Sequence, residues 1–172
     1  MYKRVSAVLG IATLVVAGCS ESPSGPPAVA CNSFLLSYSA AGPDTVNTES
    51  GVRYIEVEAG TGPVVATESS VATVHFSGYL VDEPGVAFQS SCNSGVPPAG
   101  FNVGSGLIAG SGGYYVIEGF SYGVLGMRAG GVRRVIVPTA LAYPSEDYPD
   151  PNDEFPLEGE DLIFDLHMVD LR

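Results

Sequence analysis

The chain has 172 residues, of which 19 are acidic and 7 are basic, so its formal net charge is −12. Such a charge repels phosphate backbones, and we therefore expect no nucleic-acid partner. The length suits one folded domain with extensions, and the 22 glycines and 13 prolines favour short strands and turns over long helices.

The first 18 residues have the architecture of a secretory signal. Lys3 and Arg4 precede an uncharged apolar run, residues 5–17, which is short for a membrane span. Cys19 follows the sequence VAG, a spacing that resembles the lipobox of bacterial lipoproteins, in which the cysteine is lipidated. The alternatives are an ordinary signal peptide with a chance cysteine and an uncleaved anchor. We expect Cys19 to anchor the chain to a bacterial membrane, the outer membrane facing the periplasm if the cell has two membranes.

Residues 19–50 are predicted to be a lipidated tether with a weakly patterned lead-in. Its first part, ESPSGPPAVA, is rich in proline, glycine and serine, as flexible linkers are. If Cys19 carries lipid, Cys31 and Cys92 remain, and an oxidising compartment favours a disulfide between them. Two unpaired thiols are the competing interpretation, because a sequence does not give the distance between Cα atoms. We expect no metal site, since these cysteines have no nearby histidine.

Residues 51–172 carry the patterns of a folded domain. Strands are predicted where apolar and polar residues alternate or where β-branched and aromatic residues gather. In the last strand Leu162, Phe164, Leu166 and Met168 share one face, and Asp165 and His167 share the other. The predicted strands are residues 51–59, 71–80, 86–91, 101–104, 132–137 and 162–171.

One short helix is predicted among these strands. Phe120, Val124 and Met127 recur at i, i+4 and i+7, and the pair Gly130–Gly131 is expected to end the helix. Residues 107–114 (LIAGSGGY) are rich in glycine, so we expect a flexible loop there and no packed element.

The residues taken alone indicate little chemistry. His75 and His167 lie within predicted strands and are interpreted as ordinary strand residues. Asp150, Asn152 and Glu154 have the alternate spacing of oxygen ligands, but no glycine follows at the turn position of a calcium loop. A solvated acidic loop is favoured there over bound calcium. The aromatic residues are interpreted as core, and the chain as an exported β-rich domain.

Residues 116–143 add a resemblance to a known family. They read VIEGFSYGVLGMRAGG, then a basic strand, then PTALAY, and resemble the central segment of FKBP-type peptidyl-prolyl isomerases. Further matches, such as VHFSGYL before this segment and LIFDLHMVDL after it, extend the resemblance over about residues 51–171. It implies an α+β fold, an FKBP-like twisted antiparallel sheet of about five strands curled around one short helix.

The resemblance also implies a function that needs no cofactor. The implied activity is cis-trans isomerisation of X-Pro bonds, here in exported proteins, by a domain that is a monomer and binds macrolide ligands of the family. The backbone N–H of Ile117 and the hydroxyl of Tyr143 would be donors to the peptide, and Phe120 would be the pocket floor. The other substrate-binding residues that the resemblance implies are Phe76, Phe88, Gln89, Val116, Phe155 and Phe164.

The sequence departs from the family pattern around the rim of this pocket. Gln89 replaces the usual aspartate and cannot supply its charge, and Ala99 stands at a position that is often aromatic. Residues 107–114 have the place of an insertion. We therefore expect an isomerase of reduced rate, and the alternative is a proline-peptide-binding module or chaperone on the same fold. A surface lipoprotein whose acidic loop binds a partner or calcium is a third hypothesis.

Overall fold

The computed structural model describes residues 44–92, 96–143 and 157–172. Several predictions from the sequence fall outside these residues and stay predictions: the signal segment, the lipidated Cys19, the tether, Cys31, and the acidic loop that contains Phe155. Within the described part of the chain, no helix is long and apolar enough to cross a membrane.

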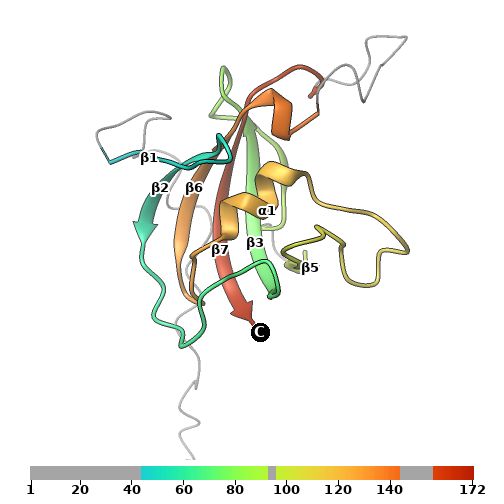
Figure 1. The fold of residues 1–172 in the computed structure, drawn as a ribbon. Helices are drawn as coiled ribbons and strands as arrows, with labels where there is room; N and C mark the ends of the chain where they lie inside the picture. Colours follow the sequence, from blue (N-terminus) through green and yellow to red (C-terminus); the bar gives the residue numbers. More distant parts are fainter. Residues whose placement is uncertain (1–43, 93–95, 144–156) are drawn as a thin grey trace, which may run out of the picture.

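The domain is built on one antiparallel sheet whose strand order is β1-β2-β6-β7-β3-β4, with β5 also pairing with β3 (Figure 1). The strands are β1 (Val46–Asn47), β2 (Arg53–Glu58), β3 (Val71–Leu80), β4 (Ala87–Ser90), β5 (Ala99–Asn102), β6 (Val132–Val137) and β7 (Leu162–Leu171). The strands β3, β6 and β7 have the bounds that the alternation predicts.

The predicted number of about five strands agrees with the structure, because β4 and β5 share one position beside β3. The strand β5 pairs with the first half of β3 and β4 pairs with the second half, so together they fill one strand position beside β3. Counting that shared position once, and leaving aside the two-residue β1, the sheet has five strand positions. The α+β prediction is confirmed.

The helix α1 (Glu118–Val124) lies against one face of the sheet and ends earlier than predicted. Leu125 leaves the helical conformation with ψ 135°, and Gly126 follows with φ 79°. Met127 is therefore outside the helix, although it is buried with the same cluster. The prediction that Gly130–Gly131 end the helix is wrong, because the chain turns away four residues before them, where the N–H of Gly126 donates to the carbonyl of Ala66 at 3.0 Å.

Two features hold α1 close to β6. A Cβ atom on Gly119 would lie 2.1 Å from Cγ1 of Val137, so only glycine permits this approach. At the other end of the helix, Arg133 Nη1 donates to the carbonyls of Gly123 (2.9 Å) and Leu125 (2.8 Å), which are left without partners where a helix ends. Two residues of β6 thus fix the position of α1: Val137 at its start and Arg133 at its end.

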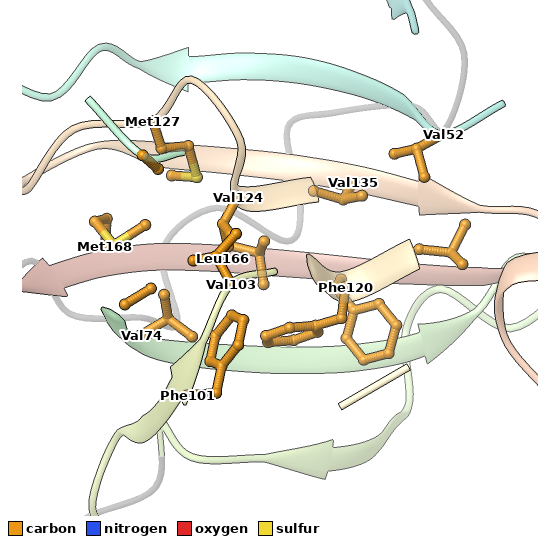
Figure 2. Close-up of a cluster of buried hydrophobic side chains, with 14 of the residues drawn as sticks. Val52, Val74, Phe101, Val103, Phe120, Val124, Met127, Val135, Leu166 and Met168 are labelled. Carbon is orange, nitrogen blue, oxygen red and sulfur yellow. The ribbon is translucent and has the colours of Figure 1, made fainter. Parts of the chain in front are cut away.

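The face of the sheet beneath α1 is the apolar core. Phe120 and Val124 of the helix point into a cluster that includes Val74, Val135 and Leu166 from three neighbouring strands (Figure 2). The predicted apolar side of β7, Leu162, Phe164, Leu166 and Met168, belongs to the same cluster. Alternation along each strand thus assigns one side of the sheet to the helix.

The opposite face, which we call the far face, combines apolar and charged groups. Tyr79, Ile136 and Ile163 form a second small cluster. Beside it Arg134 and Asp165, which are opposite each other in the ladder between β6 and β7, form a buried two-bond ion pair with distances of 2.7 and 2.8 Å. Asp165 is on the opposite side of β7 from Phe164, as the alternation predicts.

Residues 107–114 form a largely exposed turn that bridges and hydrogen bonds shape, and of them only Ile108 packs against the core. Isolated bridges join Phe101 to Ile108 and Leu107 to Tyr115, and Ile108 packs against the core. The hydroxyl of Ser111 organises the turn: it donates to the carbonyl of Ile108 at 2.8 Å and accepts from the N–H of Tyr114 at 2.9 Å. A serine side chain thus supplies hydrogen bonds that the glycine content alone did not suggest.

Candidate functional site

Four phenylalanine rings from four different elements meet at one end of α1. The centroid of Phe120 lies 5.4 Å from that of Phe76 and 5.2 Å from that of Phe164, and both pairs are edge to face. Phe88 contacts Phe164 as well, also edge to face, with 5.9 Å between the ring centroids. The structure therefore brings together residues that the sequence placed in one pocket, from β3, β4, α1 and β7.

Phe120 lies at the bottom of this group, since it is 3% exposed while Phe76 and Phe88 are only partly buried. A fifth ring, Phe101 of β5, packs on it at 5.5 Å between centroids. The sequence analysis placed Phe101 in a strand but did not connect it with the site. Its position next to Phe120 depends on β5 pairing with the first half of β3, which no local pattern indicates.

Gly78 makes room for two of the rings. A Cβ atom there would lie 2.6 Å from the ring of Phe88 and 2.9 Å from that of Phe164. Any larger residue at this position would push β4 and its ring away from the cluster. The glycine therefore contributes to the site by leaving space, although it has no side chain to contact a ligand.

Ile117 is the residue that begins α1. Its backbone is extended, with φ −62° and ψ 153°, and its carbonyl accepts the N–H groups of Phe120 at 3.1 Å and Ser121 at 3.3 Å. Its own N–H donates no hydrogen bond to another described residue. A fixed donor that lies three residues before Phe120 is available for a ligand carbonyl.

Val116 and Tyr143 lie beside the same core. Both are partly buried and pack against the main cluster. The N–H of Val116 donates to the carbonyl of Gly106 at 2.9 Å, which ties the segment directly before α1 to the loop after β5. The carbonyl of Tyr143 accepts from the N–H of Gly159 at 3.0 Å, so the backbone of this tyrosine is held by the turn before β7.

The opposite wall is less enclosed. Gln89 is opposite Gly78 in the ladder between β3 and β4, and its side chain is exposed. Ala99 is only partly buried and begins β5. Cys92, two residues after β4, takes part in a disulfide bond. Because Cys19 and Cys31 both lie outside the described residues, the pairing of Cys31 with Cys92 stays a prediction.

The ionisable groups with shifted pKa values lie on the far face and not among the four rings. Burial lowers the pKa of His167, with a further lowering from His75 that is opposed by Asp165 and Glu58. The ion pair with Asp165 raises the pKa of Arg134. The aromatic group itself contains no nucleophile, and the described residues include no group of three His, Cys, Asp or Glu side chains that could hold a metal ion.

A cavity of about 200 Å³ lies beside Val116, and we call it the α1 cavity; none of the four rings is among the described residues that line it. It is lined by one side of α1, the loop after β5 and one residue of the segment before β3. The residues are Glu68, Val103, Gly104, Ser105, Gly106, Val116, Glu118, Ser121, Tyr122 and Leu125. None of them was predicted as a site residue except Val116.

An antiparallel sheet curled around one short helix, with aromatic rings at the start of the helix, defines a small domain with an apolar site beside a backbone N–H, that of Ile117, which donates to no other described residue. A family model described as FKBP-type peptidyl-prolyl cis-trans isomerase matches residues 62–169, which is more than half of the chain. The chain belongs to this family.

Relatives of known sequence agree with the family. The chain is 35% identical over 124 residues to the chloroplastic peptidyl-prolyl cis-trans isomerase FKBP16-3 of Arabidopsis thaliana, covering 72% of this chain and 50% of the relative. It is 31% identical over 138 residues to the outer membrane protein MIP of Legionella longbeachae, covering 80% of this chain and 52% of the relative. The chain thus spans about half the length of these curated relatives.

Solved structures share the fold. FkpA from Escherichia coli is similar with a TM-score of 0.58 and 27% identity, covering 77% of this chain and 54% of that one. AtFKBP13 is similar with a TM-score of 0.57 and 26% identity, covering 73% of this chain and 97% of that one. The FKBP-like fold that the sequence implied is therefore confirmed.

Proposed function

We propose that this protein is a peptidyl-prolyl cis-trans isomerase that acts on exported polypeptides from a membrane anchor. The observation that carries the proposal is the meeting of Phe76, Phe88, Phe120 and Phe164 near Ile117, whose N–H donates to no other residue in the described part of the chain. Family membership supports the reaction class.

The reaction needs neither a nucleophile nor a metal. The barrier to rotation about a peptide bond, about 18–20 kcal/mol, comes from amide resonance, which is lost in the twisted transition state. An apolar site that holds the proline ring favours this twisted, less dipolar form. Donors placed at the neighbouring carbonyls stabilise it further. We assign these donor roles to the N–H of Ile117 and the hydroxyl of Tyr143, with Phe120 as floor and Val116 as part of the wall.

The rate is proposed to be reduced by the opposite wall. Gln89 can donate and accept hydrogen bonds but carries no charge, and its side chain is exposed. If charge at this position matters, Gln89→Asp raises kcat/KM, whereas Gln89→Ala leaves it unchanged or lowers it. An equal kcat/KM in the unmodified chain, Gln89→Asp and Gln89→Ala would exclude Gln89 as the cause of a reduced rate.

We further propose that residues 1–18 direct export and that lipid on Cys19 anchors a monomer to the membrane. The charged start, the apolar run and the placement of the cysteine support this location. One relative, from Legionella longbeachae, is named an outer membrane protein. Globomycin-type inhibition of lipoprotein signal cleavage, followed by mass spectrometry of the chain, tests the anchor: the expected result is a shift from a lipidated form starting at Cys19 to the uncleaved precursor.

The test of the enzyme is exchange spectroscopy by NMR on a short X-Pro peptide with catalytic amounts of the full-length chain. We expect faster exchange between the cis and trans signals, and suppression of this acceleration by a macrolide ligand of the family. Absence of acceleration at every peptide concentration would contradict the activity.

The second candidate is a proline-peptide-binding module or chaperone on the same fold, which the exposed Gln89 favours. The same NMR samples separate the two functions. Peptide signals that broaden on binding without any gain in exchange rate would favour the binding module.

A further inference from the structure

The α1 cavity shares a wall with the proposed proline site. Val116 lines the cavity, and the next residue, Ile117, has the N–H that we assign to the substrate. A polypeptide whose carbonyl accepts a hydrogen bond from Ile117 therefore lies one residue away from the cavity. A side chain close to the X-Pro bond is within reach of it.

The charges that line the cavity have one sign. Glu68 and Glu118 are exposed at its rim, and no arginine, lysine or histidine is among the lining residues. Neither carboxylate forms an ion pair with another described residue. Glu68 is held in place by its backbone, because its carbonyl accepts the N–H of Gly104 at 2.8 Å. The cavity thus has an uncompensated negative rim in a chain that is itself strongly acidic.

A second observation, independent of the carboxylates, points to a ligand. Ser121 lines the cavity, is 8% exposed, and its buried Oγ has no hydrogen-bond partner. Buried hydroxyl groups are normally paired, and an unpaired one calls for an explanation. Gly106, another lining residue, lies next to this oxygen, since a Cβ atom there would be in van der Waals contact with it at 3.6 Å.

We propose that the α1 cavity receives the side chain of a lysine or arginine close to the proline of the substrate, and this proposal rests on the proposed isomerase function. Val103, Val116 and Leu125 offer apolar surface for the methylene stem, and Glu68, Glu118 and the Ser121 hydroxyl accept from the cationic group. A volume of about 200 Å³ suits such a side chain better than a single metal ion, which needs six or more oxygen ligands if it is calcium.

The proposal is tested by the rate of isomerisation of matched peptides. Each peptide carries one lysine, or glutamine in its place, one or two residues before or after the X-Pro pair. The full-length chain is expected to show a kcat/KM roughly threefold to tenfold higher for lysine than for glutamine at one of these positions, as one or two partly exposed ion pairs provide. Raising the ionic strength lowers this ratio.

Variants connect the preference with the cavity. The double variant Glu68→Gln with Glu118→Gln is expected to bring the ratio close to one, while the control Glu49→Gln, an exposed residue in the turn before β2, leaves it unchanged. An equal loss of preference in the control would mean that overall charge causes it, and would overturn the cavity as its source. A ratio of one in the unmodified, active chain would overturn the cavity and leave the isomerase function intact.

Ser121→Ala separates ligand binding from structure. Removal of an unpaired buried hydroxyl is expected to raise the melting temperature, and the lysine preference is expected to fall because one acceptor is lost. A higher melting temperature with an unchanged preference would exclude the hydroxyl as an acceptor for the substrate.

If the chain accelerates none of the peptides, the isomerase proposal fails. The cavity proposal is then tested separately, by measuring whether the lysine and glutamine peptides bind at the α1 cavity. In ¹⁵N spectra, shifts of the amides of Glu118 and Ser121 with the lysine peptide, and smaller ones with the glutamine peptide, would support the cavity as a site for basic side chains. Equal or absent shifts would overturn it.

Discussion

The two faces of the sheet follow different principles. Beneath α1, apolar side chains and three phenylalanine rings, those of Phe76, Phe101 and Phe164, pack around Phe120, and the proposed function depends on this group. On the far face a buried ion pair, Arg134 with Asp165, lies beside a small apolar cluster and the histidine His167. The difference suggests that substitutions on the two faces should separate activity from stability.

The largest effect is expected from Phe120→Ala, which should lower both properties. The change empties the floor shared by three other rings, and a buried phenylalanine replaced by alanine costs about 3–5 kcal/mol of stability. Urea unfolding measures the loss in the free energy of unfolding. The isomerase assay, run at low temperature so that part of the variant stays folded, should show little activity per folded molecule. Full activity per folded molecule would contradict the floor role.

Asp165→Asn should affect stability alone. It leaves the Arg134 charge buried without its counter-charge, which costs about 3 kcal/mol, while kcat/KM per folded molecule stays unchanged. As a control, Arg134→Met combined with Asp165→Leu should recover part of the loss, because no unpaired charge remains. A reduced kcat/KM in the folded single variant would show that the faces are coupled.

Tyr143→Phe should affect activity alone. Loss of one hydrogen bond to the peptide is worth about 1 kcal/mol, which corresponds to roughly a fivefold lower kcat/KM. The ring that packs against the core is kept, so the melting temperature should change little. An unchanged kcat/KM with equal melting would remove the hydroxyl from the proposed mechanism.

The smallest effect is a pH dependence of stability that originates on the far face. Burial lowers the pKa of His167 in the folded chain, so below about pH 6.5 the unfolded chain binds a proton more readily than the folded one. The free energy of unfolding should therefore fall as pH drops from about 6.5 towards the folded pKa. His167→Gln should have a flatter profile in this window, and an identical profile would place the dependence elsewhere.

Much of the fold was predictable, because β3 is rich in β-branched and aromatic residues, β7 alternates between two faces, and β6 is bounded by Gly131 and Pro138. The end of the helix was not, since Met127 continues the apolar period and is buried with the helix residues although the chain has already left the helix at Leu125. A pattern of burial at i, i+4 and i+7 therefore does not prove that the backbone stays helical.

The candidate site was predictable only in part. The family resemblance named the four rings and Ile117, whose positions follow from well-matched segments. The contact of Phe101 with Phe120 and the hydrogen bonds from Arg133 to the end of α1 join segments that are distant in the sequence. The turn within residues 107–114 depends on the hydroxyl of a single serine, Ser111. Such contacts leave no periodic signal in the sequence, and the α1 cavity, which three separate segments line, could not have been found from it.

The place of β7 in the sheet determines when the domain can fold. This strand contains Leu162–Leu171, nearly the last residues of the chain, and lies between β6 and β3. Until it has been synthesised, β1-β2-β6 and β3-β4-β5 have no strand to join them (Figure 1). The sheet therefore cannot close until the last of its described strands has been made, and sheets that need such distant pairings form slowly.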